Sequence, residues 1–340
     1  MKSALVTGVT GQDGSYLSNY LLRLGYKVYG AIRRSSSLSC ERLNYFKLLD
    51  NKNFIVAELD LTDLSSLQTF FSENNVDEVY NLAAQSFVGL SFKQPILTAN
   101  ITALGPLYIL EAIKLSNKKI KFYQASSSEL FGKVQETPQN EKTPFYPRSP
   151  YGNAKLFAHW SSINYRESYN MFTTNGILFN HESPLRGLEF VTRKITNAVC
   201  RIKLGLQDKL TLGNLDSKRD WGFAGDYVEA MYLMMQQNEP DDYVIATGKT
   251  YKIREFLLMA FNYCGIDLIF EGQNLNEKGI DKKTGKIIVD ISEKFYRPAE
   301  VDLLIGDSSK AQKCLNWKTN VVLEKLVEMM VKYDLEILKS

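Results

Sequence analysis

The chain has 340 residues, of which 44% are hydrophobic and 23% charged, so it can build a large folded core and is not an intrinsically disordered protein. Its net charge of +3 comes from basic residues scattered among acidic ones without any DNA- or RNA-binding motif, which excludes a nucleic-acid-binding protein. The two histidines and four widely spaced cysteines show no metal-ligand spacing and no disulfide framework. We therefore expect that the protein binds no metal and is located in the reducing cytoplasm.

The first predicted strand, Ser3–Thr7, runs directly into a glycine turn and then into a helical pattern. Such a turn lets backbone N–H groups approach a pyrophosphate at the positive end of a helix, although an ordinary tight turn also uses glycines. The spacing GxxGxxG points to the short-chain dehydrogenases. We predict that a dinucleotide contacts this turn through Gly8, Thr10, Gly11, Gln12, Asp13 and Gly14.

Two arginines follow the second predicted strand, Lys27–Ile32. NAD-binding proteins carry an acidic residue here for the ribose 2′-hydroxyl, whereas this chain has Arg33 and Arg34. Guanidinium groups form paired, charge-assisted hydrogen bonds with phosphate. We therefore predict NADP as the cofactor, with Arg33 at its 2′-phosphate; a solvated basic pair in a loop is the alternative.

Later strands also end in residues that can contact a cofactor. The third predicted strand, Phe54–Leu59, is followed by Asp60 and Leu61 near the expected adenine. Each of these positions could be plain α/β packing, but the carboxyl ends of parallel strands line one crevice. After the fourth predicted strand, Glu78–Tyr80, the expected contacts are Leu82, Ala84 and Ser86.

The residues most informative about chemistry follow the next predicted strand, Lys121–Ala125. This strand delivers Ser127 and Glu129 to its carboxyl end, and Tyr151 and Lys155 come later, four apart on a predicted helix. Residues four apart share a helix face, where a Tyr–Lys pair can move a proton off a hydroxyl while a nicotinamide takes the hydride. The added carboxylate predicts a second proton transfer, as oxidation of a sugar followed by loss of water requires.

Strand and helix patterns alternate over the first half of the chain, which predicts a Rossmann-type, doubly wound parallel α/β sheet. We assign residues 1–180 to this NADP-binding domain, completed by a strand near 243–247, and residues 181–340 mainly to a smaller α/β lobe over the crevice. In this lobe we expect short strands at Leu268–Phe270 and Ile287–Ile291, joined by an exposed loop or hairpin. We expect no signal peptide and no apolar run long enough to cross a membrane.

With these features in order, the chain resembles the extended short-chain dehydrogenase/reductase family, and within it the GDP-mannose 4,6-dehydratases, almost end to end. The motifs that carry the resemblance are TGVTGQDGSYL at 7–17, QASSSELFG at 124–132, TPFYPRSPYGNAK at 143–155, NHESPLRG at 180–187, DSKRDWG at 216–222 and YRPAEV at 296–301. The YxxxK pattern marks only the superfamily, whereas the last three motifs are far more specific to GDP-sugar dehydratases.

The resemblance implies that the smaller lobe, residues 181–340, binds the nucleotide sugar. It also implies which further residues contact NADP and this substrate. His181 and Arg186 match cofactor contacts of the family, with a hydrogen-bonded structural role as the alternative for His181. The substrate diphosphate needs cations, for which arginine is well suited. Besides Ser86, Ser127 and Glu129, the substrate residues implied are Asn180, Arg193, Lys194, Gly213, Arg219, Arg297 and Glu300.

The resemblance also implies a reaction, the conversion of GDP-mannose to GDP-4-keto-6-deoxy-mannose by C4 oxidation, loss of water from C6 and return of the hydride to C6. Tyr151 is expected to take the C4 hydroxyl proton, with Lys155 and the nicotinamide favouring its phenolate. Glu129 is expected to take the C5 proton, and either Glu129 or Ser127 to assist the departing hydroxyl. Ser127 replaces the threonine usual in the family, hydroxyl for hydroxyl.

Several alternatives remain open at this point. Gly152 and Asn153 replace a small apolar pair of the family and are expected to face the nicotinamide and sugar, so GDP-manno-heptose is an alternative substrate. A 4-keto-sugar reductase or epimerase is disfavoured by Glu129, and a non-catalytic NADP-binding regulator by the intact Tyr–Lys pair. A homo-oligomer, dimer or tetramer, is implied, with the segment 33–37 near a neighbouring subunit; no nucleic acid or membrane partner is expected.

Overall fold

The computed structural model describes residues 1–34, 40–295 and 304–339. Within these residues, seven parallel strands form a central sheet in the order β11-β6-β5-β4-β1-β2-β3. Their bounds are β1 Ser3–Thr7, β2 Lys27–Ile32, β3 Phe54–Glu58, β4 Glu78–Asn81, β5 Lys121–Ser127, β6 Thr173–Leu178 and β11 Tyr243–Ile245. The strand order reverses between β1 and β4, and in such sheets the crevice for a ligand lies at that point.

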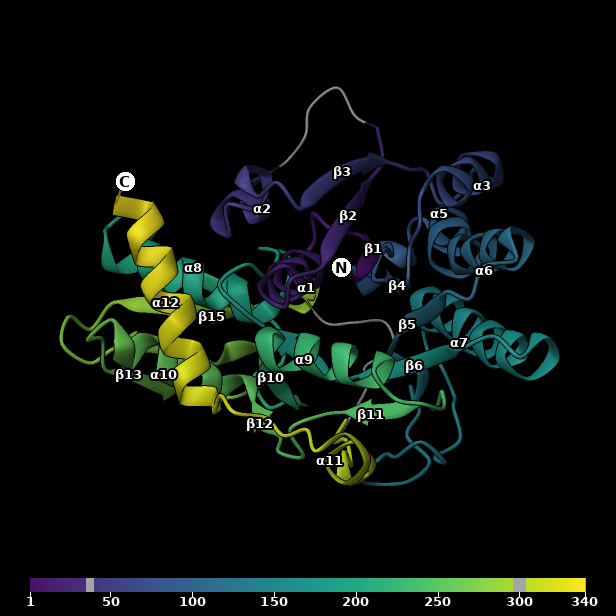
Figure 1. Cartoon of the computed structure of the whole chain (residues 1–340). Helices are drawn as coiled ribbons and strands as arrows, with labels where there is room; N and C mark the ends of the chain where they lie inside the picture. Colours follow the sequence, from purple (N-terminus) through teal and green to yellow (C-terminus); the bar gives the residue numbers. More distant parts are fainter. Residues whose placement is uncertain (35–39, 296–303, 340) are drawn as a thin grey trace.

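Helices cover both faces of the sheet (Figure 1). On one face α1 (Gln12–Arg23) packs against α9 (Ala224–Met235), and on the other α6 (Gly105–Ser116) packs between α3 (Leu64–Glu73) and α7 (Pro150–Tyr169). Alternate residues of β1 supply the two cores, because successive side chains of a strand point to opposite faces: Ala4 and Val6 lie in the first core, and Leu5 lies in the second. The predicted Rossmann-type fold is therefore confirmed.

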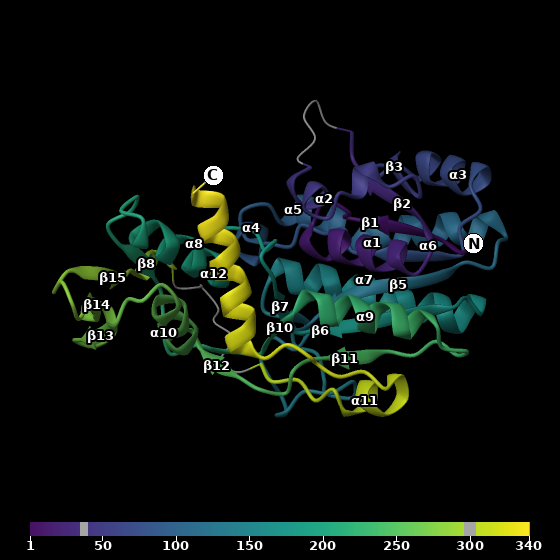
Figure 2. The same cartoon turned by 60° about the vertical axis from the view of Figure 1, so that its left-hand side comes forward.

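A smaller group of elements lies beside the carboxyl ends of the central strands (Figure 2). It contains one mixed sheet, two short ribbons and three helices that share a hydrophobic core. The sheet has the order β13 (Leu268–Glu271), β14 (Lys278–Asp281), β15 (Ile287–Ile291) and β8 (Leu210–Leu212). One ribbon pairs β7 (Asn180–Glu182) with β10 (Trp221–Phe223), and the other pairs β9 (Lys218–Arg219) with β12 (Tyr251–Lys252). The helices are α8 (Val191–Lys203), α10 (Ile253–Tyr263) and α12 (Leu323–Lys339).

Most predicted strands have the predicted bounds to within two residues. The late strand joins the main sheet beside β6 as β11, and the segment between Leu268 and Ile291 contains a hairpin built on β14. The short ribbons were not predicted, since strands of two or three residues leave no periodic pattern. The shorter helices of the described chain are α2 (Glu41–Tyr45), α4 (Val88–Ser91), α5 (Pro95–Thr98) and α11 (Ser309–Leu315), and η2 (Ala99–Leu104) is a π-helical stretch.

The helical run Pro95–Ser116 is long and apolar enough to cross a membrane by length and composition, so the prediction that no such run exists is wrong. The run is made of α5, η2 and α6, which were not recognised as continuous. Half of it is buried in the fold, where α6 packs on α3 and η2 packs on α7. A core helix passes the same test, so the apolar composition is explained by packing inside the protein.

Candidate active site

A cavity of about 860 Å³ opens where β1, β2, β3 and β4 end. It lies at the reversal of strand order, as expected for a doubly wound sheet. Of the described residues predicted to contact the cofactor, those that line it are Gly8, Thr10, Gly11, Gln12, Asp13, Gly14, Arg33, Asp60, Leu61, Leu82, Ala84, Ser86 and Arg186. Tyr151, Lys155 and His181 are not among the lining residues.

The glycine turn is shaped by close backbone packing. Gly8 has a φ of +65°, and a side chain there would lie 2.9 Å from Ala83 Cα in the loop after β4. A side chain on Gly14 would lie 2.4 Å from the Gly8 carbonyl oxygen. Gly11 caps α1 without a side-chain hydrogen bond, so no side chain occupies the position where the first N–H groups can bind a pyrophosphate. These features fit a dinucleotide cofactor.

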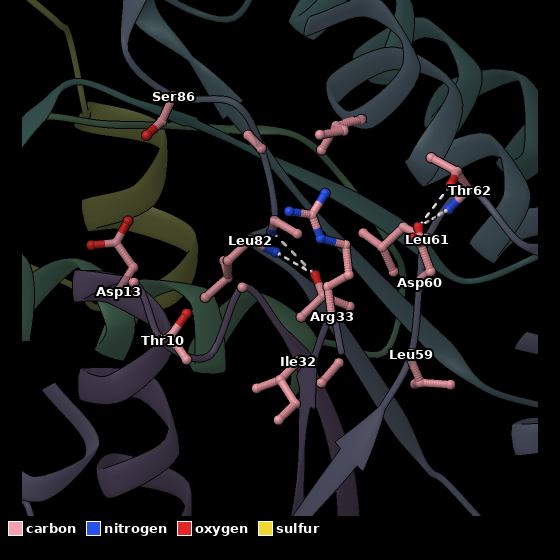
Figure 3. A pocket seen from close by; sticks show the side chains of 18 of the residues that line it. Thr10, Asp13, Ile32, Arg33, Leu59, Asp60, Leu61, Thr62, Leu82 and Ser86 are labelled. Atoms are coloured by element: carbon pink, nitrogen blue, oxygen red, sulfur yellow. Dashed lines mark hydrogen bonds between the residues drawn. The ribbon is translucent and has the colours of Figure 1, made fainter. Parts of the chain in front are cut away.

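The two arginines after β2 differ in their surroundings. Arg33 lines the cavity, and Figure 3 shows it between the loop of Leu82 and that of Leu61. Arg34 instead pairs with Glu58 at 3.6 Å on the exposed surface. Asp60 accepts hydrogen bonds from the backbone N–H and hydroxyl of Thr62, at 2.9 and 2.7 Å, which fixes the turn after β3. Arg33 is therefore the guanidinium that faces the cavity.

The chemistry-bearing side chains converge at the end of β5 and the start of α7. The Ser127 hydroxyl hydrogen-bonds the Tyr151 phenol and also accepts the Glu129 backbone N–H at 3.2 Å. Ser149 caps α7 by accepting the Gly152 N–H at 3.0 Å, which starts the helix next to Tyr151. Lys155 Nζ lies 5.8 Å from the centre of the Tyr151 ring and donates to the Ala125 carbonyl at 2.6 Å.

The pKa of Tyr151 is raised, contrary to the expectation that Lys155 lowers it. Burial is the largest cause, the hydrogen bond from Ser127 opposes it only partly, and the nearby Glu129 carboxylate raises the pKa further. Burial also lowers the pKa of Lys155 to about 8. Burial makes the ammonium charge of Lys155 costly, whereas its hydrogen bond to the Ala125 carbonyl favours that charge.

Gly152 and Asn153 lie on different sides of α7. Gly152 is buried, and a side chain there would lie 2.9 Å from the Glu129 carbonyl oxygen, so glycine allows the helix to approach the Glu129 segment. Asn153 is exposed and lines a surface groove with Phe157 and Trp160. The expectation that both face the nicotinamide and sugar is therefore wrong for Asn153, because neighbouring helix residues are rotated by about 100°.

His181 is bound to the protein through both ring nitrogens. Nε2 lies 2.9 Å from Asp13 Oδ2, and Nδ1 lies 2.7 Å from the Phe179 carbonyl oxygen. Burial would lower the pKa of the imidazole, but the Asp13 carboxylate outweighs burial and raises it. Burial would likewise raise the pKa of Asp13, yet His181 brings it down to about 2. This geometry favours a structural role for His181, in which its two hydrogen bonds join β7 to the glycine turn.

Two cations expected at the diphosphate are engaged inside the protein. Arg193 is only 8% exposed and pairs with Asp334 at 2.7 Å, so the expectation that it binds substrate phosphate is wrong. Four of its five N–H groups donate to the buried Asp334 carboxylate and to backbone carbonyls, so the guanidinium is directed into the protein. Lys194 donates to the Thr211 carbonyl at 2.7 Å and lies 3.3 Å from the centre of the Phe295 ring. Burial lowers the pKa of Lys194.

Of the other predicted substrate residues, Asn180 and Arg219 lie in the short ribbons, and Gly213 directly follows β8. Asn180 begins β7, and Arg219, in β9, is buried with Nη1 donating to the Lys218 carbonyl at 2.8 Å. A side chain on Gly213 would lie 2.7 Å from the Phe295 carbonyl oxygen. The predictions for Arg297 and Glu300 lie outside the described residues.

Sequence reasoning missed Arg42 and Asn100, which also line the cavity. Arg42 Nε donates to the Leu185 carbonyl at 2.7 Å and Nη1 to the Thr10 carbonyl at 3.0 Å, so it joins the glycine turn to the loop after β7. Both residues stand outside the glycine turn and the strand ends. The glycine spacing and the strand-end positions therefore carry no signal for them.

A buried histidine behind β5 leads to a prediction about stability. The Ser126 hydroxyl lies 3.0 Å from His159 Nδ1, and burial lowers the pKa of His159 from 6.5 to about 4. Between these pH values the unfolded chain binds the proton that the native state rejects, so native stability falls as the pH is lowered. On going from pH 6.5 to 4, the unmodified protein should lose on the order of 3 kcal/mol more stability than His159→Gln. Urea denaturation at both pH values measures this difference; equal losses would contradict it.

Comparisons with known proteins match almost the whole length of this chain. The family model described as GDP-mannose 4,6 dehydratase matches residues 5–330. The GDP-mannose 4,6 dehydratase of Cricetulus griseus is 52% identical over 347 aligned residues, covering 100% of this chain and 93% of the relative. The Vibrio cholerae enzyme is 50% identical and covers 99% of this chain and 94% of the relative.

A solved structure supports the fold at much lower identity. RMD from Pseudomonas aeruginosa, in complex with NADPH, superimposes with a TM-score of 0.77 at 22% identity. The match covers 99% of this chain and 100% of that one. At this identity the similarity establishes the fold alone.

Proposed function

This chain belongs to the GDP-mannose 4,6-dehydratase family, and from that premise we propose that it is a hydro-lyase that converts GDP-mannose to GDP-4-keto-6-deoxy-mannose with NADP. The observation that carries the proposal is the cluster at the end of β5, where Ser127 bonds Tyr151 and Glu129 follows in the next turn. A simple dehydrogenase needs only the Tyr–Lys pair. The additional carboxylate supports a reaction with two proton transfers.

The cofactor cavity supports NADP. The glycine turn leaves the start of α1 open to a pyrophosphate, and Arg33 lines the cavity where a 2′-phosphate would be bound. Thirteen of the sixteen residues predicted to contact the cofactor line the cavity, and Tyr151, Lys155 and His181 do not. When bound, NADP accepts a hydride from C4 of the sugar and later returns it to C6.

Tyr151 and Glu129 carry out different proton transfers in this reaction. Tyr151 takes the C4 hydroxyl proton, with Ser127 donating a hydrogen bond that stabilises the phenolate. Glu129 takes the proton from C5, which the C4 ketone has made acidic. Glu129 passes this proton to the departing C6 hydroxyl, which leaves as water, with Ser127 assisting by a hydrogen bond. Return of the hydride to C6 requires a proton at C5, and the proton held by Tyr151 since the first step balances it. Lys155 orients the site from the Ala125 carbonyl and supplies a cation below its pKa of about 8.

The experiment that tests this function is mass spectrometry of the purified protein with catalytic NADP and either GDP-mannose or a GDP-manno-heptose. Loss of one water from GDP-mannose without accumulation of NADPH is the expected result. Water loss from the heptose alone would keep the mechanism and replace the substrate. A reductase, an epimerase or a regulator would release no water from either sugar.

Cofactor selectivity gives a separate prediction at Arg33. Arg33→Ala should weaken NADP binding about tenfold or more and leave NAD binding nearly unchanged, because only NADP carries the phosphate that the guanidinium pairs with. Arg34→Ala is the matched control, since Arg34 pairs with Glu58 outside the cavity. Calorimetric titration with both nucleotides measures the effect. Equal weakening of NAD and NADP, or a larger effect at Arg34, would contradict the role.

We also propose that the protein acts in the cytoplasm as a homo-oligomer. Support for oligomerisation comes from the outer face of α7, where Phe157 is 45% and Trp160 is 55% exposed beside a groove. Large exposed aromatic side chains in one patch are typical of an interface. Light scattering of the intact protein distinguishes a monomer, a dimer and a tetramer.

A further inference from the structure

The C-terminal helix α12 carries one buried carboxylate, Asp334, which binds side chains of a neighbouring helix. Asp334 is 1% exposed and accepts hydrogen bonds from Arg193 Nε at 2.9 Å and Nη2 at 2.7 Å. It also accepts the Thr196 hydroxyl at 2.7 Å. Both partners lie on α8, which packs against α12 (Figure 2). The carboxylate therefore fixes the position of the Arg193 guanidinium.

The same guanidinium holds a backbone segment on its other side. Arg193 Nη1 donates to the Pro184 carbonyl and, at 3.1 Å, to the Arg186 carbonyl. These carbonyls belong to the loop that follows β7. Because Asp334 holds the other nitrogens, the guanidinium acts as a rigid bridge between α12 and this loop.

The bridged loop carries a side chain into the cofactor cavity. Arg186 lines the cavity, and its guanidinium carbon lies 3.5 Å from the centre of the Phe190 ring, while Nε lies 3.0 Å from Glu182 Oε2 without hydrogen-bond alignment. The loop is also joined to the glycine turn, since the Ser183 hydroxyl donates to Gln12 Oε1 at 2.7 Å. The position of the Arg186 backbone thus depends on contacts from both sides.

We propose that Asp334 is a positioning residue for NADP, which acts through Arg193 and the 184–186 backbone to present Arg186 to the cofactor. The proposal rests on the proposed function, since it requires that Arg186 contacts NADP. Asp334 itself is not a cavity-lining residue. Its effect on NADP binding is therefore indirect.

The test begins with Asp334→Asn, which keeps the shape of the side chain and removes the charge that holds Arg193. We expect the Kd and KM for NADP to rise about tenfold, because the loop loses its fixed bridge. The kcat at saturating NADP should stay within about twofold, because saturating cofactor restores the occupied state. Asp334→Glu is the second variant, because it keeps the charge; it should raise the same constants by a smaller factor. Glu336→Gln, an exposed change on the same helix, should change nothing.

A double-mutant cycle with Arg186→Ala separates positioning from a general loss of structure. If Asp334 acts through Arg186, its substitution should have little further effect on NADP affinity once Arg186 is alanine. Additive effects in the cycle, or unchanged NADP affinity in both Asp334 variants, would overturn the proposal. If Arg186→Ala alone leaves NADP binding intact, the proposed cofactor role of Arg186 fails first, and the positioning role fails with it.

Discussion

Glu129→Gln is expected to lower kcat for water loss from GDP-mannose by about 10²- to 10⁴-fold, the range that a positioned general base contributes. The amide is nearly isosteric with the carboxylate but cannot take the C5 proton. NADP affinity should be unchanged, because Glu129 does not line the cofactor cavity. The two measurements, turnover followed by mass spectrometry and calorimetric NADP binding, separate chemistry from cofactor retention.

The control for this experiment is Glu167→Gln, an exposed carboxylate on α7. It changes the charge of the protein equally and should leave turnover within about twofold, as surface substitutions usually do. If Glu129→Gln turned over at the unmodified rate, the carboxylate would not be the base and another group would have to take the C5 proton. If it lost NADP as well, the substitution would have disturbed the fold of the turn and not the chemistry alone.

The fold could be predicted from the sequence because strands at the centre of its sheet are buried on both faces. Ser3–Thr7 and the segment from Val28 to Ile32 are continuous runs of buried residues, and such runs bounded by turns are the clearest strand signal. The β7–β10 ribbon could not be predicted in the same way. Asn180–Glu182 is polar and three residues long, and it is a strand only because Trp221–Phe223 lies beside it. Its existence depends on tertiary contacts that a local pattern does not contain.

Site residues could be predicted where a motif determines the backbone geometry. They could not be predicted where a charged side chain pairs with a residue far away in the sequence. The residues of the glycine turn that were predicted to contact the cofactor all line the cavity, because the glycine spacing determines a local backbone shape. Arg193 stands beside residues expected at the diphosphate, but its partner Asp334 is 141 residues further along the chain. No local pattern reveals such a pair. The same reason explains why Arg42, which bonds Thr10 and Leu185, was missed.

Tyr151→Phe should lower kcat by about 10³-fold, because the phenol is the group that takes the C4 hydroxyl proton in the first step. The phenyl ring fills the same buried space, so the fold should be retained, and Ser127 loses only one hydrogen-bond partner. Tyr123→Phe is a matched control, since Tyr123 is also buried and its hydroxyl has no hydrogen-bond partner in the described structure.

The raised pKa of Tyr151 adds a pH dependence that distinguishes this role from simple packing. Because burial holds the phenol protonated, the fraction of phenolate grows as the pH rises, and so the rate of the first step in the unmodified enzyme should increase from neutral to mildly alkaline pH. The small residual rate of Tyr151→Phe should lack that increase. Lys155, with a pKa of about 8, loses its charge over the same range and should limit the gain at higher pH. A pH–rate profile of the C4 oxidation step in both proteins would detect the difference, and identical profiles would show that Tyr151 is not the titrating base.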